Sequence, residues 1–429
     1  MNRPRGPFRQ RELRARTRIV LTAADQFISS LQNFALVILT ARAVSAREFG
    51  AFALVNVIVI LLVGLVRAGI GEPILLGYSA RTASEIRRVA PIGMTLTLAT
   101  GLLIGGLTCG IAMIVPDPLH QPLLAMGVCV PGLVLLDFQR FLAIAWKRPV
   151  TLVGLDSAWV VVWIVVLVVA KPTTAYGEIL AWGLSGSAVA VVMTGAKPIE
   201  LASLARASRA WWRDLRRSAT SLVAEFVTLN SSNQVSTLLV TGFLGYTATG
   251  GLRAAQNLLS PVSTIGNAMR IAVVPEVIRA GGSTTKRGAR VLLGGTLAAA
   301  LIAGGASAAF LSLPASAGRQ LLGATWHNAH PLLLASGIRG VFFALTLRGT
   351  MALRADLRLP TLAWTRGVSA VVLTVVVAAF AATTDVRTTA WAFVGFAVFQ
   401  WLLFEAAARR PARSTDDDPA RPTRHAARG

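Results

Sequence analysis

Long apolar segments recur along the whole chain, and they decide its class. Several run for 18 or more residues without an Asp, Glu, Lys or Arg, for example residues 89–116. An α-helix of about 20 apolar residues crosses a hydrocarbon core about 30 Å thick. Only 14% of the residues are charged, against roughly 25% in ordinary soluble proteins. The sequence therefore excludes a water-soluble protein and predicts one that crosses a membrane several times.

Twelve segments are suited to span the membrane, so the expected fold is an all-α integral membrane protein. Their expected ranges are 19–41, 50–70, 89–115, 122–145, 150–170, 178–196, 219–241, 252–275, 289–313, 329–351, 361–384 and 388–408. Because twelve is even, both termini lie on one side. Loops and tails on that side hold about thirty of the 42 Lys and Arg residues, and the other loops hold five. The positive-inside rule places both termini in the cytoplasm.

The longest cytoplasmic loop, residues 197–218, divides the chain into two sets of six spans. It reads as a basic amphipathic helix, with Trp211, Trp212 and Leu215 beside several arginines, and such helices lie on anionic lipid. The expected parts are a basic segment 1–18, an N-lobe 19–196, this linker 197–218, a C-lobe 219–408 and a disordered tail 409–429. Because the basic residues lie in short loops and not in one domain, nucleic-acid binding is not expected.

The two halves are weakly similar, which predicts an internal repeat. At an offset of 200 residues, Asp25 matches Glu225, Asn33 matches Asn233 and Gly50 matches Gly250, and the members of each pair occupy the same position in the order of spans. Repeats of six spans have the same orientation, so their symmetry axis runs along the membrane normal. Two six-helix lobes around a central cationic cavity are expected.

Polar side chains are concentrated in the first, second, seventh and eighth spans. Exposed to lipid they would be unfavourable, so they are expected to line water or protein. Asp25 and Arg67 lie at similar depth in the first two spans, and Glu225 and Arg270 repeat that depth in the seventh and eighth. Two interpretations remain open. The acids and arginines form neutralising ion pairs, or the arginines exchange a carboxylate for a substrate phosphate.

Three other arginines within spans are interpreted as local: Arg140, Arg339 and Arg348 are expected to snorkel or to pair nearby, with Asp137 as a partner for Arg140. An enzyme is the weaker class. The chain has no phosphate-binding loop motif and no H-E-x-x-H, and its longest outside loop, about 314–328, contains no acid. Neither a metal site nor a disulfide is expected from the four histidines and two cysteines.

The first hairpin resembles a known family. Residues 23–54, AADQFISSLQNFALVILTARAVSAREFGAFAL, resemble the polysaccharide-exporter branch of the multidrug/oligosaccharidyl-lipid/polysaccharide (MOP) superfamily, which includes the Wzx-type flippases for lipid-linked O-antigen and teichoic-acid oligosaccharides. In that branch a polar first helix is followed by a short outside loop and a Phe-Gly pair, here Phe49-Gly50. The resemblance implies a bacterial inner-membrane protein that moves undecaprenyl-diphosphate-linked glycans outward by alternating access of two lobes.

The resemblance also assigns expected roles. Residues suited to the substrate's diphosphate are Arg67, Arg253 and Arg270, and those suited to its saccharide are Asn33, Asn233, Gln234, Gln256 and Asn257. Asp25 and Glu225 are the positions for gating or for coupling to H⁺ or Na⁺, and no other cofactor is expected. A polysaccharide polymerase or glycosyltransferases are possible partners.

Three alternatives remain. A MATE-type drug/cation antiporter should show unpaired acids and few cavity arginines. A membrane glycosyltransferase or ligase should transfer sugar in vitro. A scaffold for envelope enzymes would not need intramembrane charges.

Overall fold

The structure is a computed structural model that describes residues 7–74, 83–146, 148–194, 204–260, 273–274 and 276–410. Within these residues every regular element is a helix. Ten of them contain windows long and apolar enough to cross a membrane. The expected all-α, multi-pass membrane fold is confirmed.

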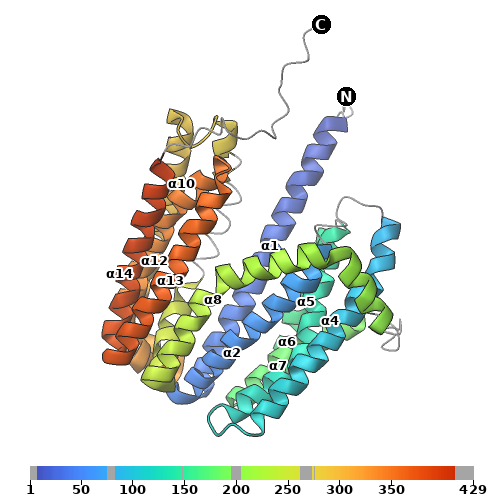
Figure 1. The fold of residues 1–429 in the computed structure, drawn as a ribbon. Helices are drawn as coiled ribbons and strands as arrows, with labels where there is room; N and C mark the ends of the chain where they lie inside the picture. The colour runs from blue at the N-terminus through green and yellow to red at the C-terminus, as the bar shows by residue number, and fades with distance from the viewer. Residues whose placement is uncertain are drawn as a thin grey trace, which may run out of the picture.

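The first half of the chain forms an N-lobe of antiparallel helices (Figure 1). These are α1 (Pro7–Ala43), α2 (Ala46–Val66), the π-helical continuation η1 (Arg67–Gly71), α4 (Ala83–Ala112), α5 (His120–Ala145), α6 (Pro149–Ala170) and α7 (Ala175–Thr194). Local signals set their starts. Ser45 and Glu48 form a capping box at α2, and Pro149 occupies the first turn of α6, where a missing N–H is tolerated.

The second half begins with α8 (Leu204–Leu258), whose later part forms a C-lobe together with the helices that follow. These are α10 (Lys286–Leu311), α11 (Ala315–Leu322), the 3₁₀ turn η3 (Gly323–Thr325), α12 (Trp326–Ala355), α13 (Leu359–Thr383) and α14 (Val386–Arg409). Thr285 and Asp385 cap α10 and α14 with their side-chain oxygens. We call the end of the molecule that carries the predicted cytoplasmic loops the basic end.

Helix α8 contains a sharp reversal at Gly245, where φ is 80° and ψ is 178°. Contacts across it prove the hairpin: the Thr241 and Thr249 hydroxyls are 3.0 Å apart, and Arg253 donates to Gln234 at 3.2 Å. In a straight helix Gln234 and Arg253 would lie about 28 Å apart. The loop expected over 242–251 is therefore wrong, because the turn is confined to the one residue that tolerates a left-handed backbone.

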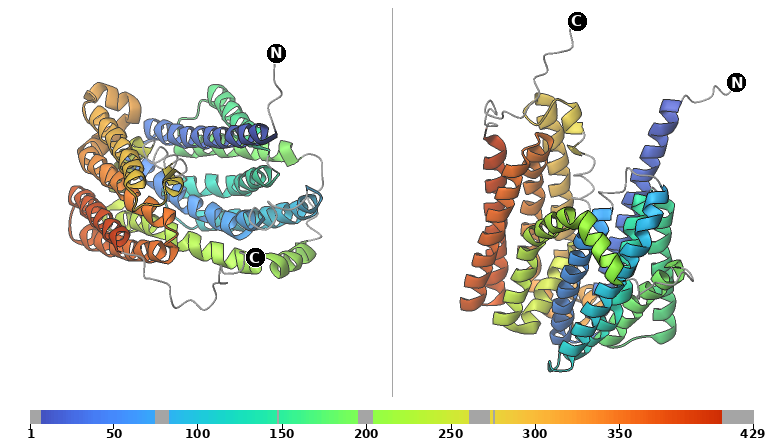
Figure 2. Two further views of the ribbon diagram at one scale, coloured as in Figure 1. Left: turned by 90° about the horizontal axis from the view of Figure 1, so that it is seen from above. Right: turned by 45° about the vertical axis from the view of Figure 1, so that its right-hand side comes forward.

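The linker expected over 197–218 is not separate from the seventh span. From Leu204 to Gly245 the helix contains no other non-helical residue, and Figures 1 and 2 show it crossing the N-lobe before it enters the C-lobe. Trp211 and Leu215 are buried in a cluster with Ile86 and Phe138 of α4 and α5. Trp211 therefore packs against the N-lobe, whereas Trp212 is 57% exposed.

The lobes meet at the end opposite the basic end. One hydrophobic cluster there joins Phe49 of α2 to Leu252 of α8 and Leu322 of α11. At the basic end, each lobe has its own cluster, around Met351 in the C-lobe and around Phe138 in the N-lobe. The molecule is therefore joined at one end and divided at the other, apart from α8.

Two close backbone approaches seal the joined end. A Cβ built on Gly50 would lie 1.8 Å from the carbonyl oxygen of Tyr246, and one built on Gly250 would lie 2.5 Å from that of Ala46. Only glycine permits this approach.

The loop expected over 314–328 is instead α11 followed by η3. It packs on the end of α1, where the Thr325 hydroxyl donates to the carbonyl oxygen of Ala41 at 3.4 Å.

Candidate functional site

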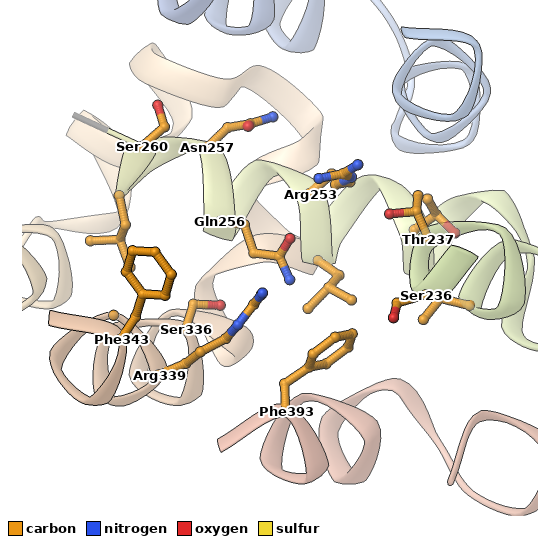
Figure 3. A pocket seen from close by; sticks show the side chains of 15 residues that line it. Ser236, Thr237, Arg253, Gln256, Asn257, Ser260, Ser336, Arg339, Phe343 and Phe393 are labelled. Carbon is orange, nitrogen blue, oxygen red and sulfur yellow. The ribbon is translucent and has the colours of Figure 1, made fainter. Parts of the chain in front are cut away.

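A cavity of about 340 Å³ lies inside the C-lobe, between the two arms of the α8 hairpin, α12 and α14 (Figure 3). Its polar lining residues are Ser236, Thr237, Thr249, Arg253, Gln256, Asn257, Ser260, Ser336 and Arg339. Val240, Leu252, Leu259, Phe343 and Phe393 form an apolar wall. Such a mixture of an apolar wall and a few converging polar groups is typical of a small-molecule site.

Two arginines define the charge of this cavity. A guanidinium nitrogen of Arg253 donates to the amide oxygen of Gln234, across the α8 hairpin. Arg339, on α12, lies with its guanidinium carbon 4.8 Å from the centre of the Phe393 ring, a cation–π contact. Figure 3 shows Arg339 pointing toward Gln256.

No acidic side chain lines the cavity, and neither arginine forms an ion pair within the described residues. The segment 261–272, which lies outside them, contains no Asp or Glu in its sequence. Cations in a low-dielectric interior need a counter-charge to offset their lost hydration. The cavity is therefore suited to an anion.

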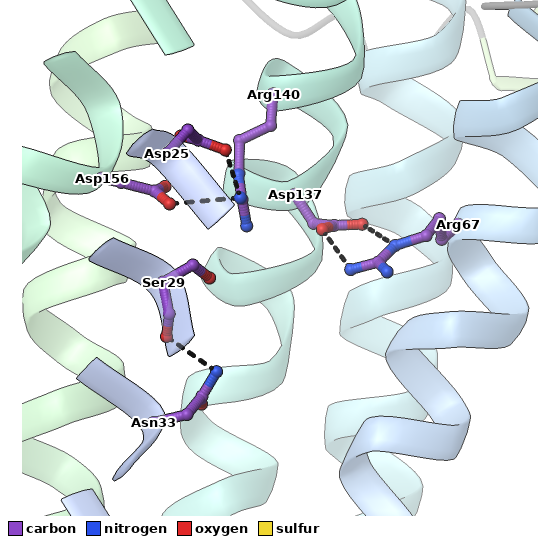
Figure 4. A network of polar contacts seen from close by, with 7 residues as sticks. All are labelled: Asp25, Ser29, Asn33, Arg67, Asp137, Arg140 and Asp156. Carbon is purple, nitrogen blue, oxygen red and sulfur yellow. Dashed lines mark hydrogen bonds and ion pairs between the residues drawn. The ribbon is translucent and has the colours of Figure 1, made fainter. Parts of the chain in front are cut away.

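A network of ion pairs occupies the N-lobe (Figure 4). Arg67, where α2 becomes π-helical, makes a bidentate contact with Asp137 of α5: Nε donates to Oδ2 at 2.9 Å and Nη2 to Oδ1 at 2.6 Å. The ring of Phe141 lies 5.7 Å from the same guanidinium. The pocket beside this pair, bounded by Val134 and Thr97, has no volume for a water-sized molecule. The Arg67–Asp137 pair therefore fills the space between α2 and α5.

Arg140, one turn further along α5, holds two carboxylates. Its Nη2 lies 2.9 Å from Oδ2 of Asp25 in α1 and 3.1 Å from Oδ2 of Asp156 in α6. Both acids are fully buried. Among the described residues, this network joins three carboxylates, those of Asp25, Asp137 and Asp156, to two guanidiniums, those of Arg67 and Arg140.

These partners differ from the expected ones. The pair Asp25–Arg67 is wrong, since each residue has another ionic partner, and Asp137 is not the partner of Arg140. Neighbouring helices, rather than neighbouring turns of one helix, supply the carboxylates. Arg348 likewise pairs with Glu405 of α14.

The remaining predicted site residues divide into three groups. Arg253, Gln256 and Asn257 meet in the C-lobe cavity, and Gln234 positions Arg253 there. Asn33 is exposed and donates to the carbonyl oxygen of Ser29 in its own helix. Arg270 and the side chains of Glu225 and Asn233 lie outside the described residues.

Sequence reasoning missed Arg339 and Asp156. Arg339 was expected to snorkel, but Phe393 and the cavity hold it inside the lobe. Arg339 lies near the centre of a predicted span, nine residues or more from either end. A charge at that depth could have indicated an interior position.

No family model matches the chain, and no curated protein matches it. Solved structures share its fold. The lipid II flippase MurJ in an inward closed conformation aligns with a TM-score of 0.68 and 10% identity, over 91% of this chain and 88% of that one. An inward-facing MATE family transporter of the MOP superfamily aligns with a TM-score of 0.68 and 12% identity, over 91% and 97%.

A third structure is a MOP superfamily transporter from Pyrococcus furiosus, for which a reverse polarity of the binding pocket suggests a different function. It aligns with a TM-score of 0.56 and 12% identity, over 91% of this chain and 94% of that one. The chain therefore has the fold of MOP superfamily transporters.

Proposed function

We propose that this protein flips a polyprenyl-diphosphate-linked oligosaccharide across the bacterial inner membrane by alternating access of its two lobes. The observation that carries the proposal is the C-lobe cavity, in which Arg253 and Arg339 have no acidic partner among the described residues. A neighbour with the same fold is a lipid II flippase, which supports a lipid-linked substrate.

The chemistry of such a substrate agrees with the lining. A diphosphate is anionic and accepts the paired N–H groups of a guanidinium in bidentate fashion. Sugars are strongly hydrated, and amides such as Gln256 and Asn257 replace that water with hydrogen bonds. The prenyl chain needs no protein site, since it remains in the lipid.

The arrangement of the lobes supports alternating access. They are joined at the end opposite the basic end and have separate cores at the basic end, so a substrate would enter from the basic end. If the basic loops are cytoplasmic, as the charge distribution predicts, this state faces the cytoplasm. The outward-facing state then requires the Gly50–Gly250 contact to open.

We assign the coupling of transport to an ion gradient to Arg140, Asp25 and Asp156, which we call the Arg140 cluster. The carboxylate of Asp156 is fully buried and lies 3.1 Å from the Arg140 guanidinium, which also contacts Asp25, so uptake of a proton or sodium ion by Asp156 would change how Arg140 is held. Asp25 retains the coupling role expected from the sequence, and Asp156 joins it.

The test is a flipping assay in proteoliposomes with a fluorescent polyprenyl-diphosphate-linked oligosaccharide, read out by a membrane-impermeant quencher. Arg253→Ala and Arg339→Ala should each slow flipping at least about tenfold, because a hydrogen bond to a charged group contributes about 1.5–3 kcal/mol. Arg279→Ala is the matched control, since that arginine is exposed and pairs only locally with Glu276. Flipping at the wild-type rate by both cavity variants would refute the proposal.

One observation favours a second candidate, a drug/cation antiporter. The buried Asp156 beside Arg140 would attract a cation, and MATE transporters share the fold. The same vesicles separate the two: uptake of a cationic dye against a pH or sodium gradient, with no flipping of the glycolipid, would favour the antiporter. Sugar transfer by the purified protein would indicate an enzyme instead.

A further inference from the structure

A second cavity, of about 520 Å³, lies at the end of the N-lobe opposite the basic end. Its walls are the loops of three helical hairpins, α1–α2, α4–α5 and α6–α7, which Figure 1 shows at that end of the molecule. It is larger than the C-lobe cavity and shares no lining residue with it. The two are therefore separate sites.

Each of the three loops is held by a hydrogen bond. The backbone N–H of Ser45 donates to Oε2 of Glu48 at 2.9 Å, and the Thr174 hydroxyl accepts a backbone N–H three residues further along at 3.1 Å. In the α4–α5 loop, Nδ1 of His120 lies 2.8 Å from the carbonyl oxygen of Ala112. The cavity is therefore preformed, and a ligand does not lose affinity to the ordering of its walls.

The charged groups of the lining are not neutralised by one another. They are Arg47, Glu48 and Asp117. Arg47 and Asp117 form no ion pair or hydrogen bond within the described residues, and Glu48 uses only one carboxylate oxygen, Oε2. One guanidinium and two carboxylates give the lining a net negative charge. Unlike the C-lobe cavity, this one disfavours a diphosphate.

The rest of the lining combines hydrogen-bonding groups with small apolar surfaces. Gln121 and Thr173 lie in the same wall as Pro118, Pro122 and Val44. The guanidinium donates hydrogen bonds, the carboxylates accept them, and the amide and hydroxyl groups do both. A sugar ring needs this combination, because its hydroxyls both donate and accept while its C–H face is apolar. The lining can therefore replace the water that a neutral sugar loses on binding.

The cavity adjoins the contact that joins the two lobes. Glu48 is two residues before Gly50, and Ser45 directly precedes Ala46. Gly50 and Ala46 both belong to the close backbone approach between α2 and α8. A substrate that leaves between the separated lobes would therefore pass beside this cavity. The distribution of basic residues predicts that this end faces outward.

We infer that this cavity binds a neutral sugar residue of the transported glycan as the substrate leaves on the outer side. Asp117 and Arg47 hydrogen-bond to the sugar hydroxyls, and Pro118 and Pro122 supply the apolar contact. The inference rests on the proposed function for its ligand class and deepens it: the C-lobe arginines recognise the diphosphate, and this cavity recognises a sugar at the exit.

Saturation-transfer NMR on the purified full-length protein tests the site without a transport assay. The probe is the free oligosaccharide that mild acid releases from a polyprenyl-diphosphate-linked glycan with uncharged sugars. Asp117→Asn and Arg47→Ala should each weaken its binding at least about tenfold, because each removes a hydrogen bond to a charged group. Arg387→Ala is the matched control and should bind as the wild type does, since that arginine is exposed at the same end of the C-lobe and does not line the cavity.

Two further measurements place the bound sugar. Inorganic diphosphate in excess should not displace the oligosaccharide, and Arg253→Ala should bind it with unchanged affinity, because the C-lobe cavity is a different site. Displacement by diphosphate would overturn the inference, and so would wild-type binding by both Asp117→Asn and Arg47→Ala. Binding of Ca²⁺ alone that is lost in Asp117→Asn, with no change in oligosaccharide binding, would identify a cation site instead and overturn it equally.

Failure of this inference is distinguishable from failure of the proposed function. Flipping of the glycolipid by a wild type that binds no free oligosaccharide would overturn the exit site alone. Binding of the oligosaccharide by the wild type and not by Asp117→Asn, without any flipping, would overturn the proposed function and leave the sugar site.

Discussion

At the residue scale, the partner of each arginine decides what that arginine can do. Arg67 is committed to Asp137 through two hydrogen bonds, although its side chain is 39% exposed. Arg253 and Arg339 form no ion pair within the described residues. Of the arginines predicted to bind phosphate, Arg67 is therefore paired with a carboxylate in this state, whereas Arg253 lines the C-lobe cavity.

Double-mutant cycles test this pairing. Arg67→Gln and Asp137→Asn should be strongly non-additive in the free energy of unfolding in detergent, with a coupling of about 0.5–3 kcal/mol, because the residues are in direct contact. Exposure of Arg67 to solvent places the value toward the lower part of that range.

The matched control combines Arg67→Gln with Asp25→Asn, which have different ionic partners. The coupling between these two changes should be smaller than in the first cycle, because the two side chains belong to one network but make no direct contact. Additivity in the first cycle together with coupling in the second would restore the Asp25–Arg67 pair and contradict the structure.

The sequence could place these charges by depth but not by direction. Counting residues from the ends of spans gave the level of Asp25 and Arg67, since each residue rises 1.5 Å. Which helix faces which is set by tertiary packing, and here α5 lies between α1 and α2 and supplies both Asp137 and Arg140. Depth alone could not have separated the three acids near one level.

At the scale of elements, the crossing of α2 and α8 depends on glycine. Gly50→Ala should destabilise the protein by about 1–3 kcal/mol, because its methyl group would overlap the Tyr246 carbonyl and one helix must shift. Thermal unfolding of the purified protein measures this. Gly106→Ala is the control: nothing lies within 4 Å of its Cβ position, so the change should be neutral or stabilising by up to about 1 kcal/mol. Equal stability of both variants would mean that the crossing is looser than described.

Helix starts can be predicted where a capping residue or a proline stands just before an apolar run, as at Ser45 and Pro149. Around α8 they were not. The amphipathic helix expected over 197–218 and the span expected over 219–241 have different compositions, which placed a boundary between them, but α8 continues through both and docks through Trp211 and Leu215.

At the scale of the whole molecule, the distribution of basic residues predicts that the basic end faces the cytoplasm. In a background with Cys109→Ala and Cys129→Ala, cysteines at Ser45 and Ser316 should react with a membrane-impermeant thiol reagent in intact cells. Cysteines at Ser84 and Arg209 should react only after permeabilisation, since they lie at the basic end. The opposite pattern would invert the orientation, and labelling of all four sites would break the assignment of spans.

The seal at the joined end has a geometric consequence. With an offset of 200 residues, Gly50 corresponds to Gly250 and Ala46 to Tyr246. Gly50 approaches Tyr246, and Gly250 approaches Ala46, so the same contact occurs twice with its members exchanged. That reciprocity is the defining property of an isologous interface in a homodimer with two-fold symmetry. The two lobes therefore meet as two subunits would, and a fused pair of six-helix protomers is the simplest ancestor that would leave glycine at both positions.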